Sequence, residues 1–346
     1  MSEDALPTKY AYAWTAASDI PLPDFLTKYK PSMIQNDGTK PWIWVSRGIP
    51  AREDEGQEAA LEEASVLLKE VTARVESIKN DASIPTRSNK KTGAKSKKEV
   101  REEVQAQAAD KFKEVATRHG YVSGKWLVFA PADRVDAIWS SLATSLISGP
   151  LAVTCAWRAK VATSPADADV STQHLICLYM PDVYDKPAVT DVMRILLKNH
   201  GLSLSGAKAN LYTALGLDSK HPSGVPSTTW KNAALLPEAE SKALKDAYFA
   251  ELATAKAVPK PAADKPDGAT AKAKPRLQKK KVDDDPFASD DEGEKEAAAA
   301  KKALPQPAPK KTAGPLPKAK AAEKRPKDSD DEEEEERPKK KKAGKK

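Results

Sequence analysis

The hydrophobic and polar positions along the chain predict strands that alternate with helices. Four segments have the apolar runs or two-residue alternation of strands, at 41–45, 124–131, 151–161 and 173–180. Apolar residues three and four positions apart predict helices over about 22–30, 56–79, 100–119, 133–148, 187–200 and 237–256. Residues 207–230 mix both patterns among Gly and Pro. Strands joined through helices predict an α+β domain with helices packed on one face of a sheet.

The segment 151–161 alternates almost without fault, and its odd-numbered residues are apolar, which predicts a buried face. The opposite face begins with small residues and ends in Arg158 and Lys160. One interpretation makes these cations solvated residues that pair with Asp167 or Asp169 in the following loop. The other interpretation makes them an anion-binding site.

Charge and aromatic content divide the chain near residue 251. Residues 251–346 contain 26 Lys and Arg against 20 Asp and Glu, with Phe287 as their single aromatic residue. This leaves 31 of the 57 basic and 30 of the 50 acidic residues for the body, so bulk charge does not make it a polyanion-binding domain. Dense charge with few apolar residues cannot offset the entropy of ordering. We expect a disordered tail at 257–346, a flexible segment at 1–19, and one domain at 20–256 with a flexible insert at about 82–98.

No motif in the sequence indicates catalysis, a metal site or a cofactor. The four His, at 119, 174, 200 and 221, lack metal-ligand spacing, and no phosphate-binding loop or nucleophile elbow is present. His119 and His200 each precede a Gly that ends a predicted helix, where a cation suits the helix dipole. We expect no enzyme activity, no metal and no cofactor. A catalytic site assembled only by folding is the alternative.

The two cysteines and the N-terminal pattern bear on whether the protein is secreted, inserted in a membrane or kept in a reducing compartment. Cys155 and Cys177 lie in apolar strand patterns, so we expect buried, reduced thiols. The start of the chain lacks a signal-peptide pattern, and no apolar run is long enough to span a membrane. We therefore expect neither secretion nor a membrane partner.

Several segments, in order, resemble a known family. The chain is similar to the basophilic leukaemia-expressed protein family over roughly residues 20–235, in "PWIWV", "GKWLVFAPADRVDAIWSSLATSLISGPLAVTCAWRAKV", "QHLICLYMPDVYDKPAVTDVMRILLKNHGL" and "LYTALGL". The resemblance implies the fold of the mRNA cap-binding translation initiation factor, a curved antiparallel sheet with helices on its convex face. "WRAKV" resembles that factor's Arg-x-Lys strand. The resemblance thus implies that Arg158 and Lys160 face an anion in the concave groove.

The aromatic residues match a cap-binding site only in part. The cap-binding factor sandwiches the methylated guanine between two Trp and reads its edge with a Trp-Glu pair, whereas no Trp is followed by Glu in this chain. Trp42 and Trp44 share one strand face and are the candidate stacking platforms. Periodicity assigns Trp126, Trp139 and Trp157 to the core. True cap recognition is therefore not expected.

The tail carries basic clusters and phosphorylation motifs. Clusters typical of nuclear localisation or nucleic-acid binding contain Lys279, Lys280, Lys281, Lys324, Arg325, Lys339, Lys340, Lys341 and Lys342. Ser289 and Ser329 precede acidic residues, the pattern that an acidophilic kinase prefers. Phosphate there adds roughly −1.5 to −2 charge at each serine and would mask the basic clusters. We expect a protein of the nucleus and cytoplasm.

These patterns predict a non-enzymatic binding protein. The leading hypothesis is weak binding of RNA or a nucleotide-like anion in the groove, assisted by the basic tail. The alternative is a protein-interaction scaffold with a regulatory, phosphorylatable, nuclear-targeting tail. The groove lining discriminates between them, because cations and exposed aromatic residues favour RNA whereas an apolar stripe favours a peptide.

Overall fold

The computed structural model describes residues 10–48, 56–166 and 172–257. In these residues the strands are β1 Ala13–Thr15, β2 Trp42–Ser46, β3 Gly124–Pro131, β4 Arg158–Ala162, β5 Gln173–Met180 and β6 Leu204–Ala209. The α-helices are α1 Leu22–Lys28, α2 Gln57–Asn80, α3 Lys97–Arg118, α4 Val135–Ser148, α5 Lys186–Lys198, α6 Asn210–Ala214, α7 Asn232–Leu235 and α8 Glu238–Ala257. A short 3-10 helix, η1, covers Pro150–Val153.

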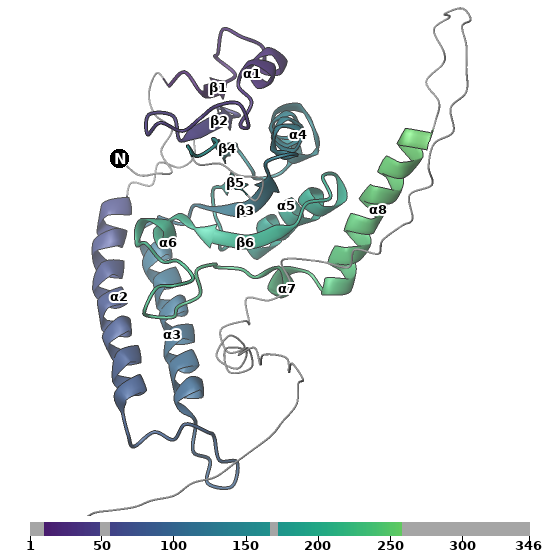
Figure 1. The fold of residues 1–346 in the computed structure, drawn as a ribbon. Coiled ribbons are helices and arrows are strands. Elements are labelled where there is room, and N and C mark those ends of the chain that lie inside the picture. The colour runs from purple at the N-terminus through teal and green to yellow at the C-terminus, as the bar shows by residue number, and fades with distance from the viewer. Residues whose placement is uncertain (1–9, 49–55, 167–171, 258–346) are drawn as a thin grey trace, which may run out of the picture. The chain divides into compact units, whose positions relative to one another are not determined.

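The six strands form one mixed sheet in the order β1-β2-β4-β5-β3-β6 (Figure 1). Every pair is antiparallel except β1 with β2, which is parallel. This parallel pair corrects the expectation of a purely antiparallel sheet. The α+β class is confirmed, and the likeness to the cap-binding factor stays a prediction.

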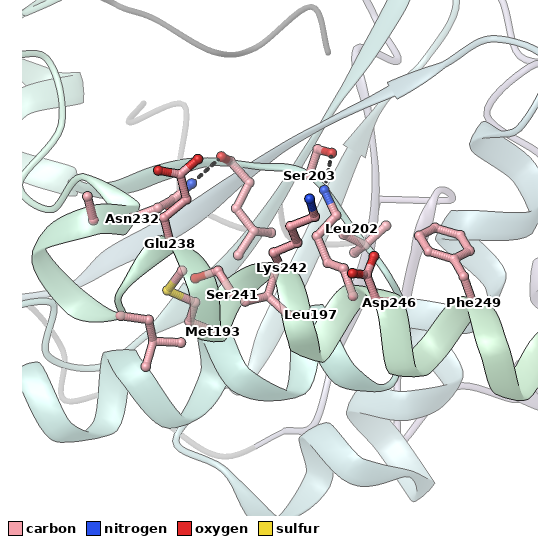
Figure 2. Close-up of a pocket in the computed structure, with 14 residues that line it drawn as sticks. Met193, Leu197, Leu202, Ser203, Asn232, Glu238, Ser241, Lys242, Asp246 and Phe249 are labelled. Atoms are coloured by element: carbon pink, nitrogen blue, oxygen red, sulfur yellow. Dashed lines mark hydrogen bonds between the residues drawn. The ribbon is translucent and has the colours of Figure 1, made fainter. Parts of the chain in front are cut away.

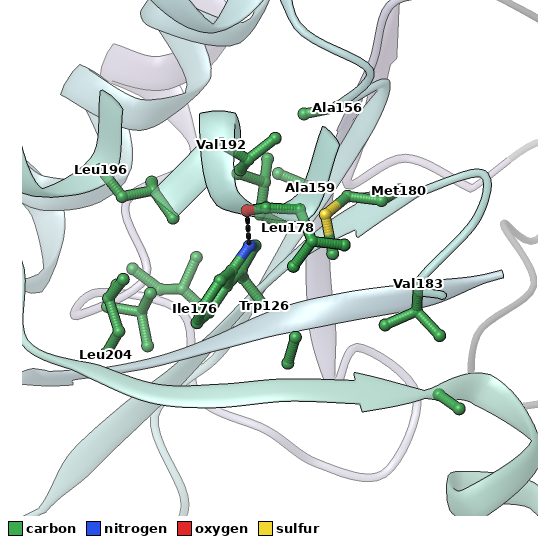
Figure 3. Packing of buried hydrophobic residues seen from close by; sticks show 14 of the residues in the cluster. Trp126, Ala156, Ala159, Ile176, Leu178, Met180, Val183, Val192, Leu196 and Leu204 are labelled. Atoms are coloured by element: carbon green, nitrogen blue, oxygen red, sulfur yellow. Dashed lines mark hydrogen bonds between the residues drawn. The ribbon is translucent and has the colours of Figure 1, made fainter. Parts of the chain in front are cut away.

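One face of the sheet carries the main hydrophobic core. Trp126, Ile176 and Leu178 point from β3 and β5 toward Val192 and Leu196 of α5 (Figure 3). The indole nitrogen of Trp126 donates a hydrogen bond to a carbonyl of α5, at 3.3 Å. Each of the helices α1 to α5 contributes buried residues to this cluster. The prediction that helices cover one face of the sheet is therefore confirmed.

Helices α2 and α3 form an antiparallel pair beside the sheet. The predicted apolar stripes face one another, with Leu68 and Val75 of α2 buried in the same cluster as Phe112 of α3. Helix α3 begins with a capping box, in which the Ser96 hydroxyl accepts from the Glu99 backbone N–H and the Glu99 carboxylate accepts from Ser96. The expected helix boundaries agree with the observed ones to within a few residues.

The segment 151–161 is the clearest correction to the predicted elements. Its first part is η1 and an irregular turn, and strand β4 begins only at Arg158. Pro150 favours the first turn of a helix because its ring fixes φ, and the Leu151 N–H donates to the Ser145 hydroxyl of α4. Val153, which was expected on the buried face, is 88% exposed.

Two edge strands were not predicted. Residues 10–19 belong to the segment expected to be flexible, yet Ala13–Thr15 pairs with β2, and Trp14 is buried with its indole N–H donating to the Ile20 carbonyl at 2.9 Å. Strand β6 pairs with β3 and contains Gly206 at a φ of 129°. A Cβ there would approach the Trp230 carbonyl oxygen to 2.8 Å, so the close passage of residue 230 requires glycine.

The two cysteines are free thiols, as expected. Cys177 is buried in β5, and Cys155 is half-buried in the turn before β4. Burial, with Asp185 nearby, raises the pKa of Cys155 to about 11. A thiol with a raised pKa is a weak nucleophile at neutral pH.

Candidate anion-binding face

Strand β4 places Arg158 and Lys160 on the face of the sheet opposite the main core. Ala159 and Val161, which alternate with them, join the helix-side cluster. The orientation of the two cations is therefore the one that the sequence pattern predicted. We call the opposite side the aromatic–cationic face, and we define it by Trp42, Trp44, Arg158, Lys160 and Tyr179.

Neighbouring strands bring aromatic rings directly against the cations. Trp44 on β2 pairs with Lys160, and Tyr179 on β5 pairs with Arg158. The Trp44 and Tyr179 rings stack with centroids 6.0 Å apart and an interplanar angle of 21°, a range in which aromatic pairs attract. The Tyr10 hydroxyl donates to the Trp42 carbonyl at 2.8 Å and ties the N-terminal segment to β2.

Each cation lies over several ring faces. The Arg158 guanidinium carbon is 4.2 Å from the Trp157 ring centroid and 5.1 Å from the Trp44 centroid. The Lys160 ammonium nitrogen is 4.1 Å from the Trp42 centroid and 5.0 Å from the Trp44 centroid. Such contacts are worth about 0.5 to 2 kcal/mol each, depending on how far water is excluded. The rings therefore orient both cations.

Burial corrects the interpretation of Lys160 as a solvated residue, whereas Arg158 is half-buried. Lys160 is 2% exposed and Trp44 is 1% exposed. Trp42 and Arg158 are half-buried and form the accessible part of the face, and Trp157 beside them is half-buried too. Of the two candidate stacking platforms, Trp42 is thus the one that an incoming ligand can reach.

Trp157 was expected in the core and packs instead beside the aromatic–cationic face. The reason is that β4 begins after it, so the alternation inferred for 151–161 does not reach Trp157. The predicted partners of the cations, Asp167 and Asp169, lie outside the described residues.

The structure adds two lysines that the sequence analysis did not select. Register pairs place Lys208, Lys125, Tyr179, Arg158 and Ser46 in one transverse row across β6, β3, β5, β4 and β2. The Lys125 ammonium lies 5.5 Å from the Tyr179 ring centroid. A signal for Lys125 exists in the sequence, because it alternates with the inward-facing Trp126 of the same strand.

The chemistry of this face suits phosphate and aromatic groups. Its strand residues in the described part of the chain include four cations, Lys125, Arg158, Lys160 and Lys208, and no Asp or Glu. Guanidinium and ammonium groups bind phosphate oxygens, and a half-exposed indole stacks on any base. Among these described strand residues there is no carboxylate that could read a guanine edge.

A separate cluster surrounds His200, just after α5. Its Nδ1 lies 3.1 Å from the Ser141 hydroxyl, and its Nε2 lies 3.0 Å from the Ser145 hydroxyl, both on α4. Burial lowers the pKa of His200 to about 4. The imidazole is therefore neutral at pH 7, which corrects its expected role as a cation at a helix end.

Stability should consequently fall in acid through His200. The unfolded imidazole binds a proton near pH 6.5 and the folded one near pH 4, so the unfolded state gains stability as the pH drops between these values. We expect a loss on the order of 1 to 2 kcal/mol, reduced from the full shift because the ring is partly solvated. Urea unfolding at pH 7 and pH 4 measures it, and a His200→Asn variant with an unchanged pH dependence would exclude this residue.

A concavity lies between α5, α8 and the segment before β6, with a volume of about 510 Å³ (Figure 2). Leu197, Leu202 and Phe249 contribute apolar surface, whereas Lys242 and Asp246 project from α8. The cavity combines an apolar stripe with charges of both signs. That lining has the character expected for a peptide groove rather than for a phosphate site.

Several sequence predictions lie outside the described residues, namely those for Ser289, Ser329, Lys279, Lys280, Lys281, Lys324, Arg325, Lys339, Lys340, Lys341 and Lys342. Within the described ranges, no cluster of three His, Cys, Asp or Glu has the arrangement of a metal site. None of the helices in those ranges has the length and apolarity needed to cross a bilayer.

A comparison with protein-family models identifies a match over most of the described domain. The family model described as basophilic leukemia-expressed protein Bles03 covers residues 3–213. The matched range contains β1 to β6 and the whole aromatic–cationic face.

Proposed function

The chain belongs to the family of the basophilic leukemia-expressed protein Bles03, and we propose that its aromatic–cationic face binds RNA or a nucleotide-like anion. In this proposal the half-buried Arg158 contacts phosphate oxygens, the buried Lys160 behind it adds positive charge, and Trp42 stacks on a base. The protein acts as a binding protein and not as an enzyme. Base identity is read weakly, so capped and uncapped ligands bind with similar affinity.

The observation that carries the proposal is the ordered contact between cations and rings on one sheet face. Arg158 and Lys160 lie 4.1 to 5.1 Å from the centroids of Trp42, Trp44 and Trp157. Their guanidinium and ammonium groups therefore have defined positions before a ligand arrives, which lowers the entropy lost on binding. The half-buried indole of Trp42 offers a base a stacking surface at the same place.

Tryptophan fluorescence of the full chain tests this proposal. Titration with GTP, a methylated cap analogue and a short uncapped RNA should quench the emission, and Trp42→Leu should weaken binding by about 1 to 3 kcal/mol, the value of one stacked base. Trp230→Phe, at the other edge of the sheet, serves as the control that also removes one fluorophore and should retain the wild-type affinity. Equal affinity of wild type and Trp42→Leu would contradict the assignment of Trp42.

For the tail we propose nuclear targeting by its basic clusters, under the control of an acidophilic kinase at Ser289 and Ser329. The added phosphate charge would neutralise neighbouring Lys and Arg. A double variant, Ser289→Glu with Ser329→Glu, should enter the nucleus less and bind RNA more weakly. Unchanged import and unchanged RNA affinity would reject this regulation.

The second candidate function is a protein-interaction scaffold, favoured by the cavity beside α8. Phe249 at its edge is a large apolar side chain left exposed. If no nucleotide or RNA quenches the fluorescence, this function becomes the better account.

A further inference from the structure

The connection between α2 and α3 is strongly basic. We define the hairpin tip as residues 82–98, which contain six Lys and Arg and no Asp or Glu. This density contrasts with the near-neutral body of the chain. In Figure 1 the two helices run side by side away from the sheet, and the tip lies at their far end.

Hydrogen bonds give the tip a defined backbone. The Asn89 N–H donates to the Ala94 carbonyl at 2.9 Å, and the Lys91 N–H donates to the Asn89 side chain at 2.9 Å. Gly93 turns the chain with a φ of 70°, a value that favours glycine. The Lys97 N–H donates to the Pro85 carbonyl at 2.9 Å and closes the base of the tip. The predicted flexible insert is thus a looped structure held at several points.

Five of the six cations of the tip, all except Lys98, fall into two groups. Lys95 pairs with Glu103 at 2.7 Å, and the Lys97 ammonium donates to the Lys79 carbonyl at 2.7 Å. The other group, near the apex, consists of Arg87, Lys90 and Lys91, which are exposed. These three form no ion pair with any residue in the described ranges.

The chemistry of the tip fits a phosphate backbone better than a membrane. Membrane-surface elements combine basic residues with large apolar side chains that insert between lipids, and among the described residues no large exposed apolar side chain lies in the tip. Ser88, Asn89 and Thr92 instead add neutral hydrogen-bond donors between the cations. Side chains of these types make the sequence-independent contacts to phosphate and sugar in nucleic-acid complexes.

We propose that the hairpin tip is a second, sequence-independent contact for RNA, with Arg87, Lys90 and Lys91 bound to backbone phosphates. It extends the proposed function from one nucleotide at the aromatic–cationic face to a longer strand. The tip connects α2 and α3, whereas the aromatic–cationic face lies on β2, β4 and β5. Variants of the two regions therefore report on them separately.

Salt-dependent RNA binding by the full chain tests the tip. The triple variant Arg87→Gln, Lys90→Gln and Lys91→Gln should reduce the slope of log affinity against log salt by about 2, since each lost phosphate contact on a single strand removes about 0.7. Affinity for a short oligouridylate near 100 mM salt should fall about 10- to 100-fold. Fluorescence anisotropy of the labelled RNA measures both quantities.

The control is a second triple variant with the same change in net charge, Lys30→Gln, Lys198→Gln and Lys220→Gln, all exposed and away from the tip. The control should keep the wild-type slope. Equal slopes for the two triple variants would overturn the inference.

Two further comparisons test whether the tip is selective for RNA and whether the tip and the aromatic–cationic face contribute separately. If the tip variant weakens binding to polyglutamate or to phosphatidylserine vesicles as much as binding to RNA, the assignment to RNA is wrong. If the tip variant loses RNA affinity while Arg158→Met with Lys160→Met keeps it, the tip is supported and the proposed function of the face fails.

Discussion

A double variant, Arg158→Met with Lys160→Met, is expected to bind GTP at least about 100-fold more weakly than the wild-type chain. Hydrogen bonds between a cation and a phosphate are worth about 1.5 to 3 kcal/mol each, and the Arg158 guanidinium can donate two of them in a bidentate pair. Their loss, with the charge of the buried Lys160 removed as well, exceeds the 2.8 kcal/mol that corresponds to about 100-fold. Methionine is chosen because its unbranched stem retains packing against Trp42, Trp44 and Trp157. Isothermal titration calorimetry of the full chain measures the affinity.

The matched control replaces two exposed lysines away from the face, Lys30→Met and Lys198→Met. It makes the same change in net charge and should leave GTP affinity within about twofold, because charges beyond a Debye length of roughly 8 to 10 Å are screened. Circular dichroism establishes that each variant is folded. A folded Arg158 and Lys160 variant with wild-type affinity would show that these cations do not contact the ligand.

Trp126→Ala is expected to lower the free energy of unfolding by about 3 to 5 kcal/mol, the usual cost of removing a buried Trp or Phe. Trp126 is 0% exposed and lies in the same buried cluster as Ile176 and Val192 (Figure 3). The substitution opens a cavity in the layer that joins the sheet to α5. It also removes the donor to the Val189 carbonyl.

Urea unfolding, followed by far-ultraviolet circular dichroism, measures the effect of Trp126→Ala. Val153→Ala is the control, because Val153 is 88% exposed and its truncation should change the free energy by no more than about 0.5 kcal/mol. A loss below about 1 kcal/mol at Trp126 would contradict its place at the centre of the core.

Long periodic segments were the part of the fold that the sequence predicted well. The stripes of α2, α4 and α5 recur every three to four residues, and apolar runs fill most of β3 and β5, which have eight residues each. A pattern repeated over many positions still predicts the element when one position deviates from it. The N-cap signal at Asp185 also predicted where α5 begins. In the structure the Asp185 side chain accepts a hydrogen bond from the Ala188 N–H.

The missed elements depend on pairing between distant segments. Strand β1 has only three residues and exists because β2 pairs with it. The helical turn that begins at Pro150 occupies the start of segment 151–161, whose alternation predicts one long strand. A helical turn and a strand of four residues can carry the same apolar pattern, so the pattern alone does not distinguish them. Local sequence holds little information about such choices, which tertiary contacts decide.

The candidate site was predicted in part for the same reason. Alternation alone assigns Arg158 and Lys160 to one face of β4. Their contacts with Trp44 and Tyr179 depend on the strand order and register, which pair β4 with β5 and also with β2, a strand more than a hundred residues earlier in the chain. Sequence therefore predicted the direction of the cations but not their aromatic surroundings.

Cross-linking tests the central claim most directly. The full chain is irradiated with a short radiolabelled oligouridylate, and the cross-linked peptides are identified by mass spectrometry. The account predicts attachment at Trp42 or Trp157, the half-buried rings beside Lys160 and Arg158, and competition by excess GTP. Cross-links confined to peptides without β2 or β4, and insensitive to GTP, would contradict it.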